Sequence, residues 1–401
     1  MNLFRDKHKS TAPVIIFDIR SGSIGAALIT FKTGGVPTVL HSIRTPISFQ
    51  KEIRPDLFLK RMLGTLEGVA LELEQKGIAK LDRGLFGPKK IGQILCVFSS
   101  PWYTSQTKIL TIERKKSFTV STDFIGKMLS KAKKHFEKSV EENEATKHIR
   151  NPQVIESNVI YTTLNGYKTS NPYGRKANSV EIAVFFSLIS GDVSKMVTEV
   201  FEKVFNTREI SFHSFALTSF SVIRDIFHAE ENFLIMDISG EITDISLIRE
   251  GVLLETVSFP IGKFSMLRRI AYALKTIPEE AHSLVRLHFE SKRKGTPAVE
   301  KELEAAEKEW QSMLGQALTD LSEGILLPKT VFLTVDSDLG EWFRCIISGY
   351  ALGQESFTAG PFSVVTLNGT KFHKYYDVRK GVESDSFLGL ETLFFHKVLV
   401  K

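Results

Sequence analysis

Residues 233–259 read FLIMDISGEITDISLIREGVLLETVSF, and this stretch decides the fold. An apolar run ends at Asp237, a short polar turn follows, and two more apolar runs are separated by a turn at Glu250 and Gly251. Short apolar runs bounded by turn residues are typical of β-strands. The stretch therefore predicts three consecutive strands, with an aspartate at the end of the first.

The same pattern of an apolar run, an aspartate, a polar turn and a second apolar run occurs near the start of the chain. Between Pro13 and Leu28 the apolar run VIIF leads to Asp18, a turn of serine and glycine follows, and a second apolar run begins. This pattern predicts a β-hairpin led by an aspartate. Because the device appears twice, the sequence predicts two similar half-domains.

The domain organisation follows from the length and from a change of pattern. A chain of 401 residues needs more than one hydrophobic core, since domains usually run to about 100–200 residues. From Ser99 to about Ser190 the pattern changes to strand, helix and two strands, which predicts an inserted α+β subdomain. We predict a first lobe at 1–98 and 191–230, the insertion at 99–190, and a second lobe at 231–401 with a helical subdomain at about 266–327. The apolar segment near the C-terminus is expected to form the closing helix of the second lobe.

The composition excludes several classes of protein. Hydrophobic residues make up 42% and charged residues 24%, as in a packed globular protein. The two cysteines, Cys96 and Cys345, are too few for a disulfide framework or a metal site. The net charge of +6 is modest and its lysines are spread, so we expect no nucleic-acid partner. No long apolar span or signal peptide is visible, so we expect a cytoplasmic protein.

Each turn carries small and hydroxyl residues behind its aspartate, which suits a phosphate clamp. Glycine lets backbone amides approach phosphate oxygens, hydroxyl groups donate hydrogen bonds, and a carboxylate can hold Mg²⁺ directly or through water. The candidate residues are Asp18, Ser21, Gly22 and Ser23 in the first turn, and Asp237, Ser239, Gly240, Thr243 and Asp244 in the second. Asp18 and Asp237 are the candidate metal ligands. For either hairpin alone, an ordinary strand-capping turn is the alternative.

Residues 236–281, MDISGEITDISLIREGVLLETVSFPIGKFSMLRRIAYALKTIPEEA, resemble the actin-like ATPase superfamily, and within it the bacterial cell-division protein FtsA and the pilus-platform protein PilM. The matching positions are Asp237, Ile238, Gly240, Thr243, Asp244, Pro260, Ile261, Gly262, Ile270, Ala271, Leu274, Glu279, Glu280 and Ala281. The resemblance implies an α/β, actin-like (ribonuclease H-like) fold of two lobes with a small inserted α+β subdomain. It also implies ATP and Mg²⁺ as cofactors, with Gly262 added to the nucleotide site.

Several residues of this chain differ from the family pattern at positions that hold the nucleotide in the family. Arg20 stands at a glycine position of the first turn, and Ser239 and Glu241 stand at glycine positions of the second. A Cβ there crowds the backbone, and Glu241 adds negative charge beside phosphate. For Arg20, a contact with phosphate and a solvated position in the turn are both open.

Three further elements of the family's nucleotide site differ as well. They are the acid that orients the attacking water, the purine-binding glycines and a charged pair near the nucleoside. The aligned residues are His213 and Ser214, the run from Thr334 to Asp338, and His282 with Val285. We therefore expect ATP hydrolysis to be absent or vestigial, while binding of ATP and Mg²⁺ and loss of this binding are both open.

The resemblance implies a scaffold in bacterial cell division, of the FtsA kind, that self-assembles and links the tubulin-like division ring to the membrane. The first alternative is a PilM-like platform for type IV pilus assembly, in which the inserted subdomain at 99–190 binds a short cytoplasmic peptide of a membrane partner. The alternative from another class is an active ATPase or sugar kinase of the same fold. The apolar Met1, Leu3 and Phe4, followed by basic residues up to Lys9, form a candidate contact with the inner membrane.

Overall fold

The structure is a computed structural model that describes residues 12–31, 35–50, 52–81, 91–142, 149–290, 297–322, 326–350, 360–372 and 374–399. The chain forms two compact units. Unit 1 comprises Met1–Phe98, Met196–Val222 and Leu367–Lys401, and unit 2 comprises Ser99–Lys195 and Ile223–Thr366. Within the described ranges no helix is both long and apolar enough to cross a bilayer. The predicted N-terminal membrane contact lies outside these ranges.

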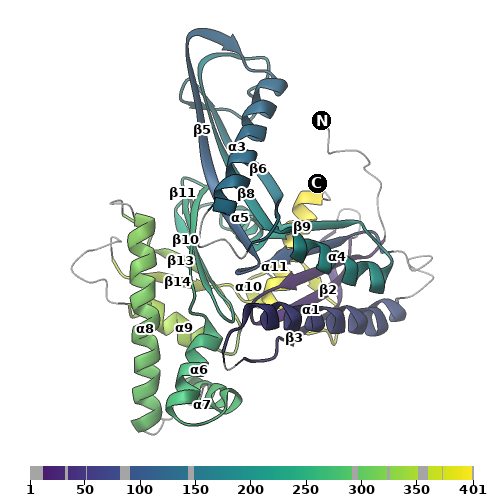
Figure 1. Cartoon of the computed structure of the whole chain (residues 1–401), viewed down its shortest axis with the longest axis vertical. Coiled ribbons are helices and arrows are strands. Elements are labelled where there is room, and N and C mark those ends of the chain that lie inside the picture. Colours follow the sequence, from purple (N-terminus) through teal and green to yellow (C-terminus); the bar gives the residue numbers. More distant parts are fainter. Residues whose placement is uncertain are drawn as a thin grey trace. The chain divides into compact units, whose positions relative to one another are not determined.

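Unit 1 is built on a six-stranded mixed sheet with the order β15-β3-β2-β1-β4-β9 (Figure 1). Its strands are β1 (Val14–Ile19), β2 (Ser23–Thr30), β3 (Thr38–Pro46), β4 (Ile94–Phe98), β9 (Ile210–Ser214) and β15 (Asp377–Val378). The first three form an antiparallel meander, whereas β1, β4 and β9 run parallel. Every residue of β1, β2 and β4 is buried, as expected for apolar strands inside a sheet. The predicted hairpin led by Asp18 is confirmed.

Helices of unit 1 form where the apolar pattern has helical spacing. The first, α1 (Pro55–Glu72), begins with proline, which needs no hydrogen-bond acceptor at this position. Its buried residues recur every three or four positions and are Phe58, Met62, Leu66, Val69 and Ala70. A π turn (Leu73–Gly77) and a 3-10 turn (Ile78–Lys80) end it. Unit 1 also contains, among its described residues, α4 (Gly191–Phe205) and α5 (Phe215–Ile226), which both cross into unit 2, with α10 (Gly369–Phe372) and α11 (Ser386–Leu399).

The C-terminal helix α11 packs against β1 and β2 of unit 1. The prediction that this segment closes the second lobe is therefore wrong. Its apolar residues need a buried face, and Phe387, Leu388, Phe394 and Phe395 find it on the first sheet. Because both half-domains offer the same kind of apolar hairpin, the sequence pattern did not distinguish the two.

Unit 2 repeats this plan in a five-stranded sheet with the order β12-β11-β10-β13-β14. Its strands are β10 (Phe233–Ile238), β11 (Thr243–Arg249), β12 (Val252–Phe259), β13 (Thr330–Val335) and β14 (Ser363–Thr366). Again three strands form an antiparallel meander, and the first of them starts a parallel series. Glu250 and Gly251 have φ of 50° and 69°, the positive values of a tight hairpin turn. The predicted three-strand device and its repetition are confirmed.

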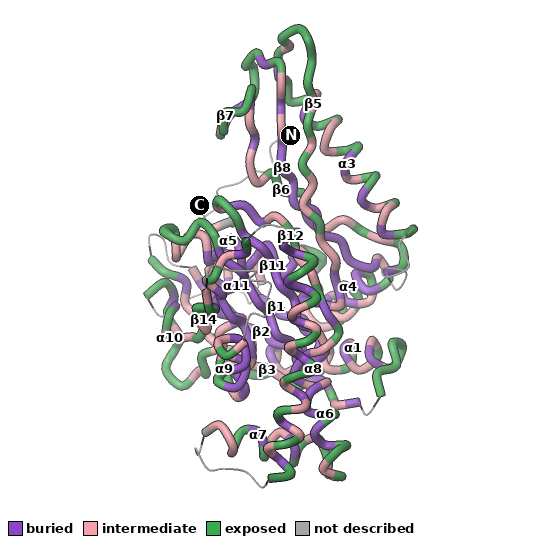
Figure 2. Tube along the Cα trace, turned by 90° about the vertical axis from the view of Figure 1, so that its left-hand side faces the viewer, coloured by how far each residue is buried: buried purple, intermediate pink, exposed green. Residues whose placement is uncertain are grey.

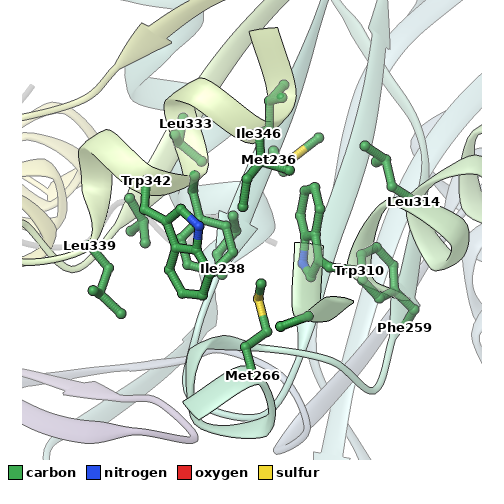
Figure 3. Close-up of a cluster of buried hydrophobic side chains, with 14 of the residues drawn as sticks. Met236, Ile238, Phe259, Met266, Trp310, Leu314, Leu333, Leu339, Trp342 and Ile346 are labelled. Atoms are coloured by element: carbon green, nitrogen blue, oxygen red, sulfur yellow. The ribbon is translucent and has the colours of Figure 1, made fainter. Parts of the chain in front are cut away.

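The core of unit 2 lies between this sheet and four helices (Figure 3). They are α6 (Lys263–Ala273), α7 (Pro278–Glu290), α8 (Pro297–Ser322) and α9 (Gly340–Ser348). Trp310 of α8 is fully buried, and its ring lies 5.8 Å from that of Phe259 and 5.6 Å from that of Phe343. Large aromatic surfaces of this kind stabilise a core strongly, so α8 is fixed to the sheet.

The segment between β4 and α4 forms a separate four-stranded antiparallel sheet, with the order β5-β8-β6-β7. Its elements are β5 (Tyr103–Thr119), α3 (Thr122–Glu142), β6 (Pro152–Leu164), β7 (Tyr167–Lys168) and β8 (Lys176–Ser190). Helix α3 covers one face of this sheet (Figure 1). An α+β insertion is therefore present, and we call it the inserted subdomain. The domain limits given above stay a prediction.

Candidate functional site

The first polar turn contains a buried ion pair. Asp18 is the next-to-last residue of β1 and is 0% exposed, and its Oδ2 accepts a hydrogen bond of 2.7 Å from Nη2 of Arg44. Arg44 lies on β3, so its side chain must cross β2 to reach β1. It crosses at Gly25, where a Cβ would lie 2.6 Å from Arg44 Nη2. Glycine at this position is what allows the pair to form.

Arg44 also binds two other side chains of unit 1. Its Nη1 donates to Ser23 Oγ at 2.9 Å, while Nε and Nη2 donate to the Asp385 carboxylate at 2.5 and 3.1 Å. A fork of this kind is the strongest contact that a guanidinium makes with a carboxylate. Arg44 therefore holds the first turn, through Asp18 and Ser23, to the residue that precedes α11.

Arg20 is a buried residue of the first turn, with only 2% of its surface exposed. Its guanidinium lies 4.9 Å from the Phe215 ring and 3.9 Å from the Phe387 ring, and Nη1 is 4.0 Å from Asp18 Oδ1. The solvated position considered for Arg20 is thus wrong. Stacking on aromatic faces makes Arg20 part of the packing between the turn, α5 and α11.

The remaining residues of this turn are held in place by the backbone. Ser21 is buried, the Arg20 amide donates to the Ser23 carbonyl at 3.1 Å, and the Gly22 carbonyl accepts from the Ile47 amide at 3.0 Å. The turn is therefore a fixed structural element.

Glu391 adds a second acidic group to the first turn from α11. Its side chain is fully buried, and burial raises its pKa well above the ordinary value; the charge of Asp18 raises it further, while the charge of Arg44 opposes the rise. The raised pKa favours the protonated, neutral form of Glu391. With Glu391 neutral, Arg20 and Arg44 are balanced by Asp18 and Asp385.

The second polar turn, in unit 2, is also tied to its neighbours. Asp237 ends β10, and its Oδ1 accepts from Thr334 Oγ1 at 2.7 Å. The Thr243 hydroxyl donates to the Ile261 carbonyl at 2.7 Å and accepts from Nε1 of Trp310 at 3.1 Å. Asp244 Oδ1 accepts from Ser258 Oγ at 2.5 Å.

Gly262 is required by the contact between the second turn and the start of α6. The carbonyls of Ser239 and Gly240 accept from the amides of Lys263 and Phe264 at 3.0 and 2.7 Å. A Cβ on Gly262 would lie 2.5 Å from the Ser239 oxygen and 2.7 Å from the Gly240 carbonyl. The first amides of α6 thus bind the turn itself.

Replacing Gly262 with alanine is therefore expected to destabilise the protein by about 2 kcal/mol, because backbone atoms must move to admit the Cβ. Gly126→Ala is the matched control: Gly126 lies in α3, where a Cβ meets no atom within 4 Å, and it should gain about 0.5–1 kcal/mol of helix propensity. Urea unfolding of both variants checks this. Equal stability of the two would contradict the packing role of Gly262.

Glu241 of the second turn is neutralised by α6. Its carboxylate forms a two-pronged ion pair with Arg268, with Nη1 to Oε1 at 2.8 Å, and it also accepts from Ser265 Oγ at 3.3 Å. Glu241 is buried. A fixed carboxylate therefore stands at the turn where the family pattern has glycine.

The elements aligned with the nucleoside site bind each other. Lys263 forms an ion pair with Asp336, and Nε2 of His282 lies 2.7 Å from Oδ2 of Asp338. Burial raises the pKa of Asp338, but the His282 hydrogen bond and the Lys263 charge outweigh it, so the pKa lies below its ordinary value. These side chains join β13 and the segment after it to α6 and α7.

No family model matches the chain, and no curated protein matches it. Among solved structures the chain is similar to one from the PilM-PilN type IV pilus biogenesis complex, with 12% identity and a TM-score of 0.62 over 96% of this chain and 97% of that chain. The chain shares the actin-like ATPase fold of that structure.

Two further structures with 11% identity were found. One is a Bacteroides thetaiotaomicron protein with an actin-like ATPase fold and unknown function, with a TM-score of 0.38 over 97% of this chain and 99% of that chain. The other is the ethanolamine utilization protein EutJ from Carboxydothermus hydrogenoformans, with a TM-score of 0.40 over 95% and 89%.

The actin-like ATPase fold implies ATP and Mg²⁺ at the two turns, but the side chains present do not fit them. A cation at Asp18 would meet the Arg44 guanidinium 2.7 Å from the same carboxylate. The Thr243 hydroxyl donates its only hydrogen to the Ile261 carbonyl, so none is left for a phosphate, and Glu241 would repel a phosphate near its turn. In the part of the chain that the structure describes, no group of three or more His, Cys, Asp and Glu side chains could hold a metal ion. Each turn instead carries its own counterion.

The structure thus places the predicted site residues in two sets. Asp18, Ser21, Gly22 and Ser23 lie together in unit 1, and Asp237, Gly240, Thr243, Asp244 and Gly262 lie together in unit 2. Their nucleotide-binding role, and the metal role of Asp18 and Asp237, stay predictions.

Sequence reasoning missed the basic and acidic partners of both turns. These partners are Arg44, Asp385, Glu391 and Arg268. Glu391 had a visible signal, because it is a lone acid in the apolar run FLGLETLFF. Gly25 in an otherwise apolar strand was a weaker signal that a side chain crosses there.

Proposed function

We propose that this protein is a nucleotide-independent platform of a type IV pilus-like assembly system, which binds the cytoplasmic segment of a membrane protein. The observation that carries the proposal is the similarity to a chain of the PilM-PilN complex over 96% of this chain, at a TM-score of 0.62. So long a match includes the inserted subdomain as well as both half-domains. PilM is found there together with PilN, and a comparable partner is proposed here.

The internal ion pairs support the nucleotide-independent part of this proposal. Catalysis of phosphoryl transfer depends on groups that position and neutralise the phosphates. At both turns such groups are bound to each other, as the Arg44–Asp18 and Arg268–Glu241 pairs illustrate. The division role and the enzyme alternative have no comparable observation in their favour.

Mg-ATP is accordingly expected to leave the protein unchanged. A ligand present at 100 times its Kd would stabilise the folded state by about 2.7 kcal/mol, so binding is readily detected as a rise in Tm. We expect no rise in millimolar Mg-ATP, and phosphate release no faster than for Asp237→Ala. A clear rise in Tm, or turnover that Asp237→Ala abolishes, would contradict nucleotide independence.

The partner is tested by chemical cross-linking in the native cell, followed by affinity isolation of the tagged protein from solubilised membranes. We expect a membrane protein with a short cytoplasmic segment, and loss of surface pili when the gene is deleted. Isolation of the tubulin-like division protein, with a division defect and normal pili, would instead support the FtsA-like role.

A further inference from the structure

The inserted subdomain carries a net charge equal to that of the whole chain. Residues 99–190 contain 14 Lys and Arg against eight Asp and Glu, which gives +6, and the remainder of the chain is neutral. On α3 some of this charge is balanced locally, since Lys127 pairs with Asp123 and Lys138 with Glu142. The excess is therefore a property of this subdomain, and β5 carries a large share of it.

Strand β5 forms one edge of the subdomain's sheet. It is 17 residues long and pairs on one side with β8, continuously from Tyr103 to Glu113 and, after an irregularity, again at Phe118 and Thr119. The amide and carbonyl groups on the other side of an edge strand have no ladder partner, so an edge of this length is a template for a further strand. Figure 2 shows half-buried and exposed residues along β5, whereas β8 beside it is largely buried.

Every second residue of β5 faces α3, because successive side chains of a strand point to opposite faces. Lys108 lies under α3, with Nζ 5.8 Å from the Phe136 ring, and Leu110 packs against the core there. Ile112 follows, and Arg114 lies 4.5 Å from the Phe118 ring. The order along this face is basic, apolar, apolar, basic. The opposite face is turned towards β12, where Thr107 Oγ1 donates to the Leu253 carbonyl at 2.7 Å.

Neither basic group of this row has a carboxylate partner within the described residues. Lys108 is half-buried, and burial lowers its pKa. An ammonium group in such surroundings gains from a carboxylate placed beside it. Arg114 is exposed and stacked on aromatic rings, which holds its donors in a fixed position.

We propose that β5 is the docking edge for an extended acidic segment of another protein, which adds to the sheet as a strand. Cross-strand neighbours contact each other on the same face, so the segment should carry an acidic residue beside Lys108, apolar residues beside Leu110 and Ile112, and an acidic residue beside Arg114. The partner pattern is acidic-x-apolar-x-apolar-x-acidic. This inference deepens the proposed function, and rests on it, by naming the chemistry of the partner segment.

A second copy of this chain does not fit the same edge. Pairing β5 with β5 would bring basic strands together, including the run from Arg114 to Lys116, and like charges in neighbouring strands are destabilising. Charge complementarity therefore favours an acidic partner over self-association at this edge.

The probe is a labelled, end-capped peptide of sequence Thr-Glu-Thr-Val-Thr-Val-Thr-Glu-Thr, and binding to the full chain is measured by fluorescence anisotropy. We expect Lys108→Glu/Arg114→Glu to weaken binding at least about tenfold, because two favourable cross-strand pairs become repulsive. Lys131→Glu/Lys134→Glu is the matched control, with the same charge change at two exposed positions of α3. It should change binding less than about threefold.

Two peptides that are N-methylated at alternate residues test strand addition itself. One set of amides donates to β5 and the other points away, so one peptide should lose binding and the other should keep it. Equal behaviour of the two peptides, or equal effects of the two charge reversals, would overturn the inference. So would no binding at all, in which case the edge lysines serve to prevent pairing.

Further outcomes distinguish failure of the proposed docking edge on β5 from failure of the proposed pilus-platform function. Tighter binding of phosphatidylglycerol vesicles than of peptide, lost in Lys108→Glu/Arg114→Glu, would assign the surface to lipid and overturn the inference. Normal isolation of the membrane partner by Lys108→Glu/Arg114→Glu would also overturn it, while the proposed function would stand. Peptide binding as expected, without any pilus-type partner in cells, would support the edge and contradict the proposed function.

Discussion

Arg44→Met is expected to lower the free energy of unfolding by about 3 kcal/mol, because removal of one member of a buried ion pair leaves the other charge uncompensated. Asp18 is 0% exposed, so water does not replace the lost guanidinium. Asp385 loses both of its hydrogen bonds to Arg44, and Ser23 loses one. Guanidinium chloride unfolding at neutral pH measures the change.

Arg54→Met is the matched control, since Arg54 is an exposed arginine of the same unit, just before α1. It should alter stability by less than about 0.5 kcal/mol. Adding Asp18→Asn to Arg44→Met should recover part of the loss, because one positive and one negative charge, Arg20 and Asp385, then remain in the cluster. A loss in Arg44→Met no larger than in Arg54→Met would show that Arg44 is not the counterion of the first turn.

Glu391→Gln is expected to stabilise the protein above pH 4.5, increasingly as the pH rises. The pKa of Glu391 is raised in the folded protein, so the folded state keeps a proton that the unfolded chain releases above about pH 4.5. Between these two pKa values each pH unit costs the wild-type protein about 1.4 kcal/mol. Glutamine has no proton to release, so this cost is absent from the variant.

Unfolding curves at pH 4, 6 and 8 test this sign. The two proteins should have similar stability at pH 4, and the variant should be more stable at pH 8. Glu383→Gln serves as the control, because Glu383 is an exposed carboxyl that precedes the same helix and should leave the pH dependence unchanged. A variant that is less stable than wild type at pH 8 would place a charged, favourably bound carboxylate at Glu391.

The candidate site was predictable only in part. The turn residues were visible because hydroxyl groups, glycines and an aspartate stand at the end of an apolar strand. Their partners were not visible: Arg268 follows Glu241 by 27 residues on a helix whose orientation depends on the Gly262 contact. The burial of Arg20 was not predictable either, since its aromatic neighbours Phe215 and Phe387 are distant in sequence.

The sequence by itself determined the strands, the two aspartate-led hairpins, their repetition and the α+β insertion. These features depend on local apolar patterns and turn residues, which act between neighbours along the chain. The tertiary structure alone decided which sheet α11 covers and which charges neutralise the turns. Asp385 and Arg44 are 341 residues apart, so a pairing of that kind is fixed by the packing of the whole unit, not by any local pattern.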